Sequence, residues 1–166
     1  MNTKFSALRF WSLFFTVLAL ATGFAHLLAL PNKINFSGGE YLAAQQSYRG
    51  WAWLGVVILL AIAFDTGLAI SVRNRRPDAV LAGLALGAMI GTQVIFWAFT
   101  FPVNVATQNW TVQPAGWEAL RARWEYSHAA SAVLELIAVV ALLFLNCRVT
   151  EAGTNGTGTR PRWLEV

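Results

Sequence analysis

The sequence predicts an all-α membrane protein, an up-down bundle of four transmembrane helices with a short outer helix between the first and the second. Its 166 residues are 57% hydrophobic and 12% charged, which is too apolar for a soluble domain of this size. Four apolar runs can each cross about 30 Å of hydrocarbon, which takes roughly 20 helical residues. They cover residues 10–30, 51–72, 80–101 and 127–147, inside one domain at 1–149.

The positive residues predict the orientation of these helices. They lie in short clusters beside the apolar runs, so they indicate orientation in a bilayer and no nucleic-acid partner, despite the net charge of +4. Lys4, Arg9 and the arginines at 73–76 and 148–162 outnumber the Lys and Arg residues of the other two connections. By the positive-inside rule, both termini are cytoplasmic and the protein lies in the cell membrane. The Gly/Thr-rich segment 150–166 is expected to be a flexible cytoplasmic tail.

The first apolar run has a second interpretation. Lys4 and Arg9, followed by an apolar core and Gly23-Phe24-Ala25, are also typical of a cleavable signal peptide. However, the apolar run continues to Leu30 and is long enough to span the membrane, which favours a retained helix. Cleavage stays an alternative, and it leaves the orientation of the other three helices unchanged.

A short outer helix is predicted between the first two spans. After a break at Pro31-Asn32, the chain reaches Ser37-Gly-Gly-Glu40, a capping box in which the two side chains satisfy each other's backbone N–H groups. The helix should cover about 38–49, with Tyr41 and Gln45 on one face. Both therefore become candidate residues at an outer site.

The third span has two different faces. Gly83, Gly87 and Gly91 form a small-xxx-small ridge, which allows close helix approach in lipid, so this face is expected to be structural. A candidate cavity lining lies nearly opposite, in the stripe Gln93, Trp97, Thr100 and Asn104. In the second span, Asp65 near the inner end is expected to pair with Arg9 or Arg73, which is also a structural role.

The strongest functional pattern lies in segment 117–135. Wound as one helix, its polar and aromatic side chains share a face because they recur at helical spacing. They are Trp117, Arg121, Trp124, His128, Ser131 and Glu135. Glu135 falls about 10 Å below His128 at 1.5 Å per residue, inside an apolar run. A carboxylate inside an apolar run needs a hydrogen-bonding or charged partner, or must be protonated, so Glu135 indicates a functional site.

Depth along the helices predicts one outward-facing cavity. His26, Gln93 and Glu135 fall at similar depth in the outer halves of three spans, so they can line the same space. The residues expected around its mouth are Asn104, Arg121, Arg123, Tyr41 and Gln45. The alternative is structural: polar side chains can hydrogen-bond neighbouring helices, tryptophans can anchor the interface, and Arg121 can pair with Glu125 at i,i+4.

Two histidines and a carboxylate also raise metal and haem alternatives. Two His and one carboxylate hold non-haem iron, but bundle sites use Glu-x-x-His, a spacing that His128 and Glu135 do not match. His26 and His128 lie on different helices and could hold haem, although the sequence has no other haem signal. We therefore expect no cofactor and no metal, with haem and non-haem iron as the alternatives.

Two short blocks resemble the anthrone oxygenase-like family of small four-helix membrane proteins. The first block is Phe101-Pro-Val-Asn104, and the second is Trp117-x3-Arg121-x-Arg123-Trp124-x3-His128, which opens the last apolar run. The N-terminal half is also similar to bacterial members. That similarity lies in His26, Leu30-Pro-Asn-Lys33, Glu40-Tyr41-Leu42, Gln45-Gln46 and Tyr48-Arg-Gly-Trp51. The resemblance covers about residues 23–145. Members often have an Arg two residues after this His, where this chain has Ala130.

The resemblance implies four membrane helices and, as in the characterised members, oxidation of a phenolic anthrone to a quinone by O₂ without a bound cofactor. By this resemblance, His128 is the expected base, with Asn104 and Arg123 as partners of the developing oxyanion. The expected substrate-binding residues are His26, Tyr41, Gln45, Gln93, Trp97, Trp117, Arg121, Trp124 and Glu135.

Three hypotheses follow for function. The first is a cofactor-independent oxygenase or oxidoreductase in the bilayer, acting on a small apolar phenol or quinol. The second is a non-enzymatic membrane protein that binds a lipid, a quinone or a protein partner, with a homo-oligomer left open. A transporter is third and weaker, because four helices without an internal repeat are unusual for one.

Overall fold

The computed structural model describes residues 3–154 of the chain, and side chains within 6–148. Within this range every regular element is a helix. Four helical segments are long and apolar enough to cross a membrane: Ser6–Lys33, Trp51–Val72, Arg76–Ala106 and Trp117–Arg148. The predictions of an all-α fold and of a multi-pass membrane protein are therefore confirmed at this level.

The four spans are built from α1 (Thr3–Lys33), α3 (Gly55–Val72), α4 (Arg76–Ile95) and α6 (Trp117–Thr154). A short helix α2 (Gly38–Gln45) and two 3₁₀ turns, η1 (Gln46–Tyr48) and η2 (Trp51–Leu54), connect α1 to α3. A π-helical turn η3 (Phe96–Thr100) joins α4 to α5 (Phe101–Ala106). The tail predicted at 150–166 lies largely outside the described residues, because α6 is described only as far as Thr154.

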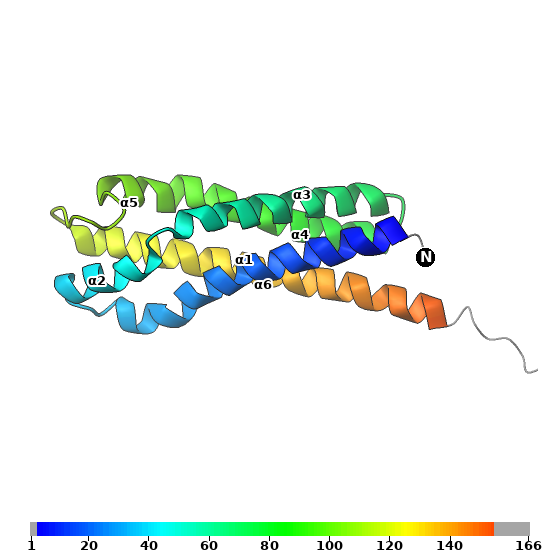
Figure 1. Ribbon diagram of the computed structural model, residues 1–166, viewed down its shortest axis with the longest axis horizontal. Helices are drawn as coiled ribbons and strands as arrows, with labels where there is room; N and C mark the ends of the chain where they lie inside the picture. The colour runs from blue at the N-terminus through cyan, green and yellow to red at the C-terminus, as the bar shows by residue number, and fades with distance from the viewer. Residues whose placement is uncertain (1–2, 155–166) are drawn as a thin grey trace, which may run out of the picture.

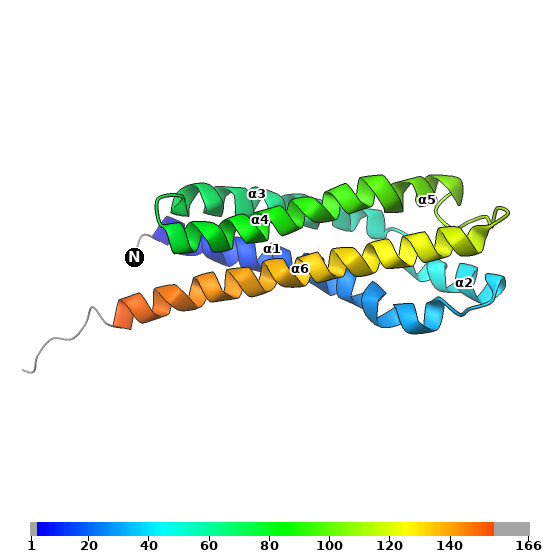
Figure 2. The same cartoon turned by 180° about the vertical axis from the view of Figure 1, so that it is seen from behind.

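The long helices lie side by side in one bundle (Figures 1 and 2). Helix α1 packs against α3 and α6, and α4 packs against the same two helices. The start of α1 and the α3–α4 connection lie at one end of the bundle, which is called the N-terminal end below (Figure 1). Helices α2 and α5 lie at the opposite end, which is called the α2 end.

Helix α1 runs further than the sequence suggested. A break was expected at Pro31-Asn32, but the helix continues through Pro31 to Lys33, and the Ile34 amide still donates to the Leu30 carbonyl at 3.0 Å. A proline removes one N–H and does not have to end a helix when neighbouring contacts hold the last turn. The extra turn carries Lys33 into the bundle.

Helix α2 begins with the capping box that its sequence predicts. The Ser37 amide and hydroxyl both donate to Glu40 Oε2, at 2.8 and 2.7 Å. These hydrogen bonds hold the pKa of the exposed Glu40 carboxyl below its usual value. The box fixes the direction in which the chain enters α2, and so the direction in which Tyr41 and Gln45 point.

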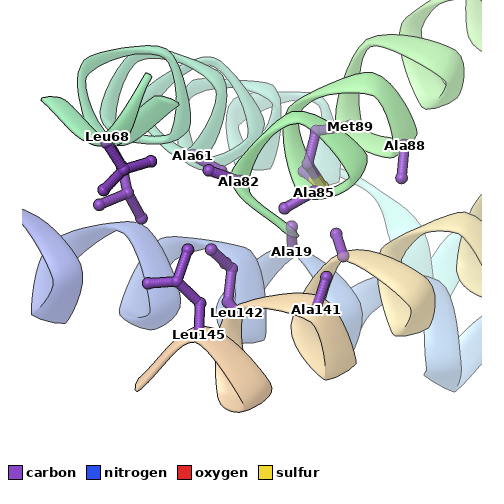
Figure 3. Close-up of a cluster of buried hydrophobic side chains, with 12 residues drawn as sticks. Ala19, Ala61, Leu68, Ala82, Ala85, Ala88, Met89, Ala141, Leu142 and Leu145 are labelled. Atoms are coloured by element: carbon purple, nitrogen blue, oxygen red, sulfur yellow. The ribbon is translucent and has the colours of Figure 1, made fainter. Parts of the chain in front are cut away.

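A core of small side chains holds the N-terminal half of the bundle together. Figure 3 shows alanines from all four long helices meeting there, with Leu68 of α3 pointing toward Leu142 and Leu145 of α6. Alanine lets helix backbones approach closely, and in lipid such packing replaces the hydrophobic effect as the driving force. This half of the molecule is therefore a closely packed scaffold.

One polar cluster lies within this half. Ser12 and Thr16 of α1 both donate to the carboxylate of Asp65 on α3, whose side chain is fully buried. Arg9 forms an ion pair with Asp78 at 3.6 Å and donates to the Leu145 carbonyl at 2.8 Å. Asp65 has a structural role, as expected, but its partners are hydroxyl groups and not the predicted arginines.

The three glycines of the α4 ridge differ in how much they contribute to packing. A Cβ at Gly91 would lie 3.0 Å from Leu134 Cδ1, so this glycine allows close contact with α6. Gly83 and Gly87 are exposed, and a Cβ on either would meet no heavy atom within 4 Å among the described residues. Only the last glycine of the ridge therefore serves packing within the described chain.

The alanine core yields a stability prediction. Ala138 is fully buried on α6, so Ala138→Leu should overpack the bundle and lower the free energy of unfolding by about 1–3 kcal/mol. Ala130→Leu, on an exposed position of the same helix, is the matched control and should change it by no more than about 0.5 kcal/mol. Equilibrium unfolding in mild detergent measures both, and equal effects would contradict the proposed packing.

Candidate functional site

A cavity of about 520 Å³ lies in the half of the bundle nearer α2. It is bordered by α1, α4, α6 and the connection around Gly50. Seven of the residues expected at a site line it: His26, Gln45, Gln93, Asn104, Trp124, His128 and Glu135. The part of the polar stripe from Trp124 to Glu135, including Ser131, therefore faces the cavity.

The two histidines meet at the cavity wall. Their rings are stacked, with centroids 4.3 Å apart and planes 22° apart. Trp124 packs against His128 at 4.1 Å, and Tyr48 packs against His26 at 4.4 Å. Nδ1 of His26 and Nε2 of His128 are buried and find no hydrogen-bond partner among the described residues. The imidazoles are thus held by ring contacts and keep hydrogen-bonding capacity.

Glu135 borders the same cavity deeper in the bundle. Its side chain is nearly fully buried, and its Oε2 atom has no hydrogen-bond partner in the part of the chain that the structure describes. The neighbouring residue on α1 is Gly23, and a Cβ added there would overlap Oε2. A glycine at this position therefore makes the room that the carboxylate occupies.

A buried ion pair lies next to two residues of the cavity lining, Tyr48 and Trp124. Lys33 Nζ lies 2.7 Å from Glu125 Oε1, and both side chains are at most 4% exposed. Tyr41 donates to the same oxygen at 2.8 Å and accepts from Gln45 Nε2 at 2.5 Å. Burial and the Glu125 charge raise the pKa of Tyr41, so the phenol stays neutral and donates. This network joins α1, α2 and α6.

Aromatic rings surround the ammonium group of that pair. Lys33 Nζ lies 4.6 Å from the ring centroid of Tyr48 and 5.0 Å from that of Trp124. Cation–π attraction of this kind compensates part of the cost of removing a charge from water. The same Trp124 contacts His128, so the ion pair and the histidine stack share a wall.

The π-helical turn η3 sets which residues of the third span face α6. A π turn inserts one extra residue into the helix and rotates everything after it, a feature often found at functional sites. Thr100, the last residue of this turn, hydrogen-bonds Ser127 at 2.8 Å, and after the turn Asn104 Oδ1 accepts from Trp124 Nε1 at 2.8 Å. Asn104 thereby holds the indole that packs on His128.

Five of the predicted site residues lie outside the cavity lining. Arg123 is exposed, donates to the Ala98 carbonyl at 2.6 Å and lies over the Phe99 ring. Arg121 donates to the Phe36 carbonyl and covers Trp117, so it does not form the i,i+4 pair expected with Glu125. The remaining three are the exposed Trp97, the half-buried Trp117 and the buried Tyr41, which reaches the lining through Gln45.

Sequence reasoning missed several parts of the site. Its candidates did not include Lys33, Gly23 or Trp110, the last of which lines the cavity, and Glu125 was considered only as a surface partner of Arg121. A signal existed for Glu125, which falls one turn before His128 on the helix that carries the stripe. Lys33 lay beyond the expected end of the first span, so the pair could not be recognised from hydropathy.

Within the described residues, no three His, Cys, Asp or Glu side chains are grouped as a metal site would require. Comparisons with protein-family models, curated proteins and solved structures find no match.

The buried ion pair gives a prediction for stability. Lys33→Met leaves the Glu125 carboxylate buried without its cation, which should lower the free energy of unfolding by about 3–5 kcal/mol. In the double variant Lys33→Met/Glu125→Leu, most of that loss should be recovered, because no charge remains buried. Arg49→Met, at an exposed cation, is the control. A double-mutant cycle by unfolding in detergent measures the coupling, and additive effects would show that the pair is not formed.

Proposed function

We propose that this membrane protein binds a small apolar phenol or quinol in the cavity and oxidises it with O₂, without a bound cofactor. In this proposal it lies in the cell membrane as an up-down bundle. Both termini and the tail are cytoplasmic, and α2 is on the outer side. The reaction type follows from the resemblance to the anthrone oxygenase-like family, and the site geometry supports it.

The observation that carries the proposal is a cavity with an apolar, aromatic wall and a few polar groups that lack partners in the described chain. Its volume of about 520 Å³ suits a molecule of two or three fused rings. Pockets for small molecules are roughly 300–1,000 Å³ and combine aromatic walls with few polar groups. Trp124, Trp51 and the histidine stack provide flat surfaces for a planar ring.

His128 is the proposed base. Its Nε2 atom has no hydrogen-bond partner among the described residues and is therefore available to accept a proton, and general-base catalysis contributes about 10²–10⁴-fold. Removing the proton from a phenol gives an electron-rich anion that can reduce O₂. Asn104 can stabilise the oxyanion, because its Oδ1 is occupied by Trp124 and its amide N–H groups are left to donate. Gln93 can donate from α4.

Arg123 has no role in the proposed reaction, because its guanidinium lies outside the cavity lining. Its guanidinium would have to leave the Ala98 carbonyl to reach the cavity. The stacked histidines also argue against haem between them, because a macrocycle would have to separate rings whose centroids are 4.3 Å apart. The side chains around the cavity therefore fit a small organic ligand better than axial ligation.

The second candidate is a non-enzymatic membrane protein that binds a lipid, a quinone or a protein partner. The network of Lys33, Glu125 Oε1, Tyr41 and Gln45 favours it, since hydrogen bonds and ion pairs of this kind join helices in membranes without catalysing a reaction. The two candidates differ in one outcome, namely whether O₂ is consumed when a phenol or quinol is bound.

Oxygen uptake by the purified protein tests the proposal. With an anthrone or a hydroquinone as substrate, the wild type should consume O₂ and show no haem absorption. His128→Ala should lower kcat/KM by about 10²-fold or more. Trp53→Phe, at a highly exposed ring, is the control and should retain uptake. A Soret band would replace the proposal by a haem protein, and no uptake from folded wild type would favour the binding protein.

The proposed orientation has a separate test. In a Cys147→Ser background, which removes the single native cysteine, Asn74→Cys should be protected from a membrane-impermeant maleimide in intact cells. Ala115→Cys, on the connection before α6, should react. Both positions are exposed, so accessibility within the protein does not limit labelling. The reverse pattern would place both termini outside.

A further inference from the structure

We infer that the cavity is built for a diphenol that hydrogen-bonds at both ends, with Glu135 as a second proton acceptor below His128. This inference rests on the proposed function, because it selects one substrate class for the same site. It also gives Glu135 a catalytic role and makes Gly23 the residue that positions it.

The first support is the arrangement of two hydrogen-bonding groups along one cavity wall. His128 and Glu135 both border the cavity, and they lie on the same face of α6. The rise between them is about 10 Å at 1.5 Å per residue. A para-diphenol with one hydrogen bond of about 2.7 Å at each end spans roughly 11 Å. The two residues are therefore separated along the helix by about the length of one such molecule.

The second support is that Glu135 does not join helices. Its Oε2 atom has no partner among residues 6–148, although burying a carboxylate without one is costly. The α1 residue facing it is Gly23, which offers no side-chain donor and whose missing Cβ leaves space for the carboxylate. Asp65 and Glu125, in contrast, each accept hydrogen bonds from side chains of other helices, so a ligand that donates would supply what Glu135 lacks.

The third support is the charge of the lining. Its cationic residue is Arg49, which is exposed at the rim and donates to Gln46 Oε1 at 2.7 Å. No cation borders the cavity beside Glu135 in the described part of the chain. The deep end therefore suits a neutral O–H donor and disfavours a carboxylate or a phosphate ligand.

A diphenol also matches the number of proton acceptors. Its oxidation breaks two O–H bonds and transfers two electrons from the ring to one O₂. His128 and Glu135 each take one proton, and both protons then pass to the reduced oxygen, so the products are a quinone and H₂O₂. A monophenol supplies one O–H donor and leaves Glu135 without a role.

Binding under anaerobic conditions tests the inference apart from any oxidation. Two probes are compared by quenching of tryptophan fluorescence in the full-length protein in nanodiscs: 1,4-naphthalenediol and its monomethyl ether. The wild type should bind the diol about tenfold or more tightly, because the ether lacks one donor to a buried carboxylate. Glu135→Leu should reduce this preference to within about twofold. Glu118→Leu, an exposed carboxylate on the same helix, should keep it.

A second variant separates binding from proton transfer. Glu135→Gln retains an acceptor oxygen of the same shape, so it should keep most of the diol preference while peroxide production falls by about 10²-fold. Size-exclusion profiles and thermal unfolding verify that both Glu135 variants are folded. Gly23→Ala, which displaces the carboxylate, should weaken diol binding and leave binding of the monoether within about twofold.

The outcomes distinguish the two proposals. Equal affinity for the diol and the ether in the wild type, with His128-dependent uptake of O₂, overturns the two-ended site and leaves the proposed oxidation standing. A diol preference that depends on Glu135, without any uptake, supports the two-ended site and overturns the oxidation. An unchanged preference in Glu135→Leu would falsify the role given to Glu135.

Discussion

The ion pair between Lys33 and Glu125 is the interaction on which the site depends. It joins the last turn of α1 to α6, and through Tyr41 it also fixes α2. Lys33 lies two turns beyond His26, and Glu125 lies one turn before His128, so the pair sets the register in which the two histidines stack. A buried pair of this kind is weak evidence for stability but can specify one arrangement of helices. Here the arrangement it specifies is the cavity wall.

The two halves of the bundle are stabilised by different physics. Toward the N-terminal end, alanines allow the helices to pack closely, and Asp65 is satisfied by hydroxyl groups of α1. Toward α2, the helices separate around a cavity and are joined by a buried ion pair, phenol and amide hydrogen bonds, and ring contacts. Hydrogen bonds and ion pairs between long side chains can hold two helices at a fixed separation, whereas close packing of small side chains brings the helices together. The closely packed N-terminal half therefore supports the half nearer α2, in which the cavity separates the helices.

Hydropathy and helical spacing predicted the parts of this structure that depend on pattern alone. The four spans follow from apolar length, and the stripe Trp124, His128 and Glu135 follows from spacing on one helix. Features that depend on tertiary contacts were not predicted. Pro31 indicated a helix end, yet contacts of the following turn carry α1 on to Lys33. The π turn that contains Trp97 has no sequence signature of its own. Trp97 is exposed there and Phe96 lines the cavity in its place, whereas Thr100 and Asn104 line the cavity as predicted. Arginines were assigned to the cavity by proximity along the chain, whereas backbone carbonyls bind them outside it.

The contrast between Asp65 and Glu135, two of the buried carboxylates, bears most directly on function. Both lie deep in the bundle, and both face α1. Opposite Asp65, that helix presents Ser12 and Thr16, which donate to the carboxylate. Opposite Glu135 it presents Gly23, which makes room and donates nothing from a side chain. Position 23 therefore offers the carboxylate space and no donor, whereas the corresponding positions opposite Asp65 supply two hydroxyl groups. A glycine there is explained when the carboxylate must stay free for a donor that enters the cavity, which is the property a ligand site requires.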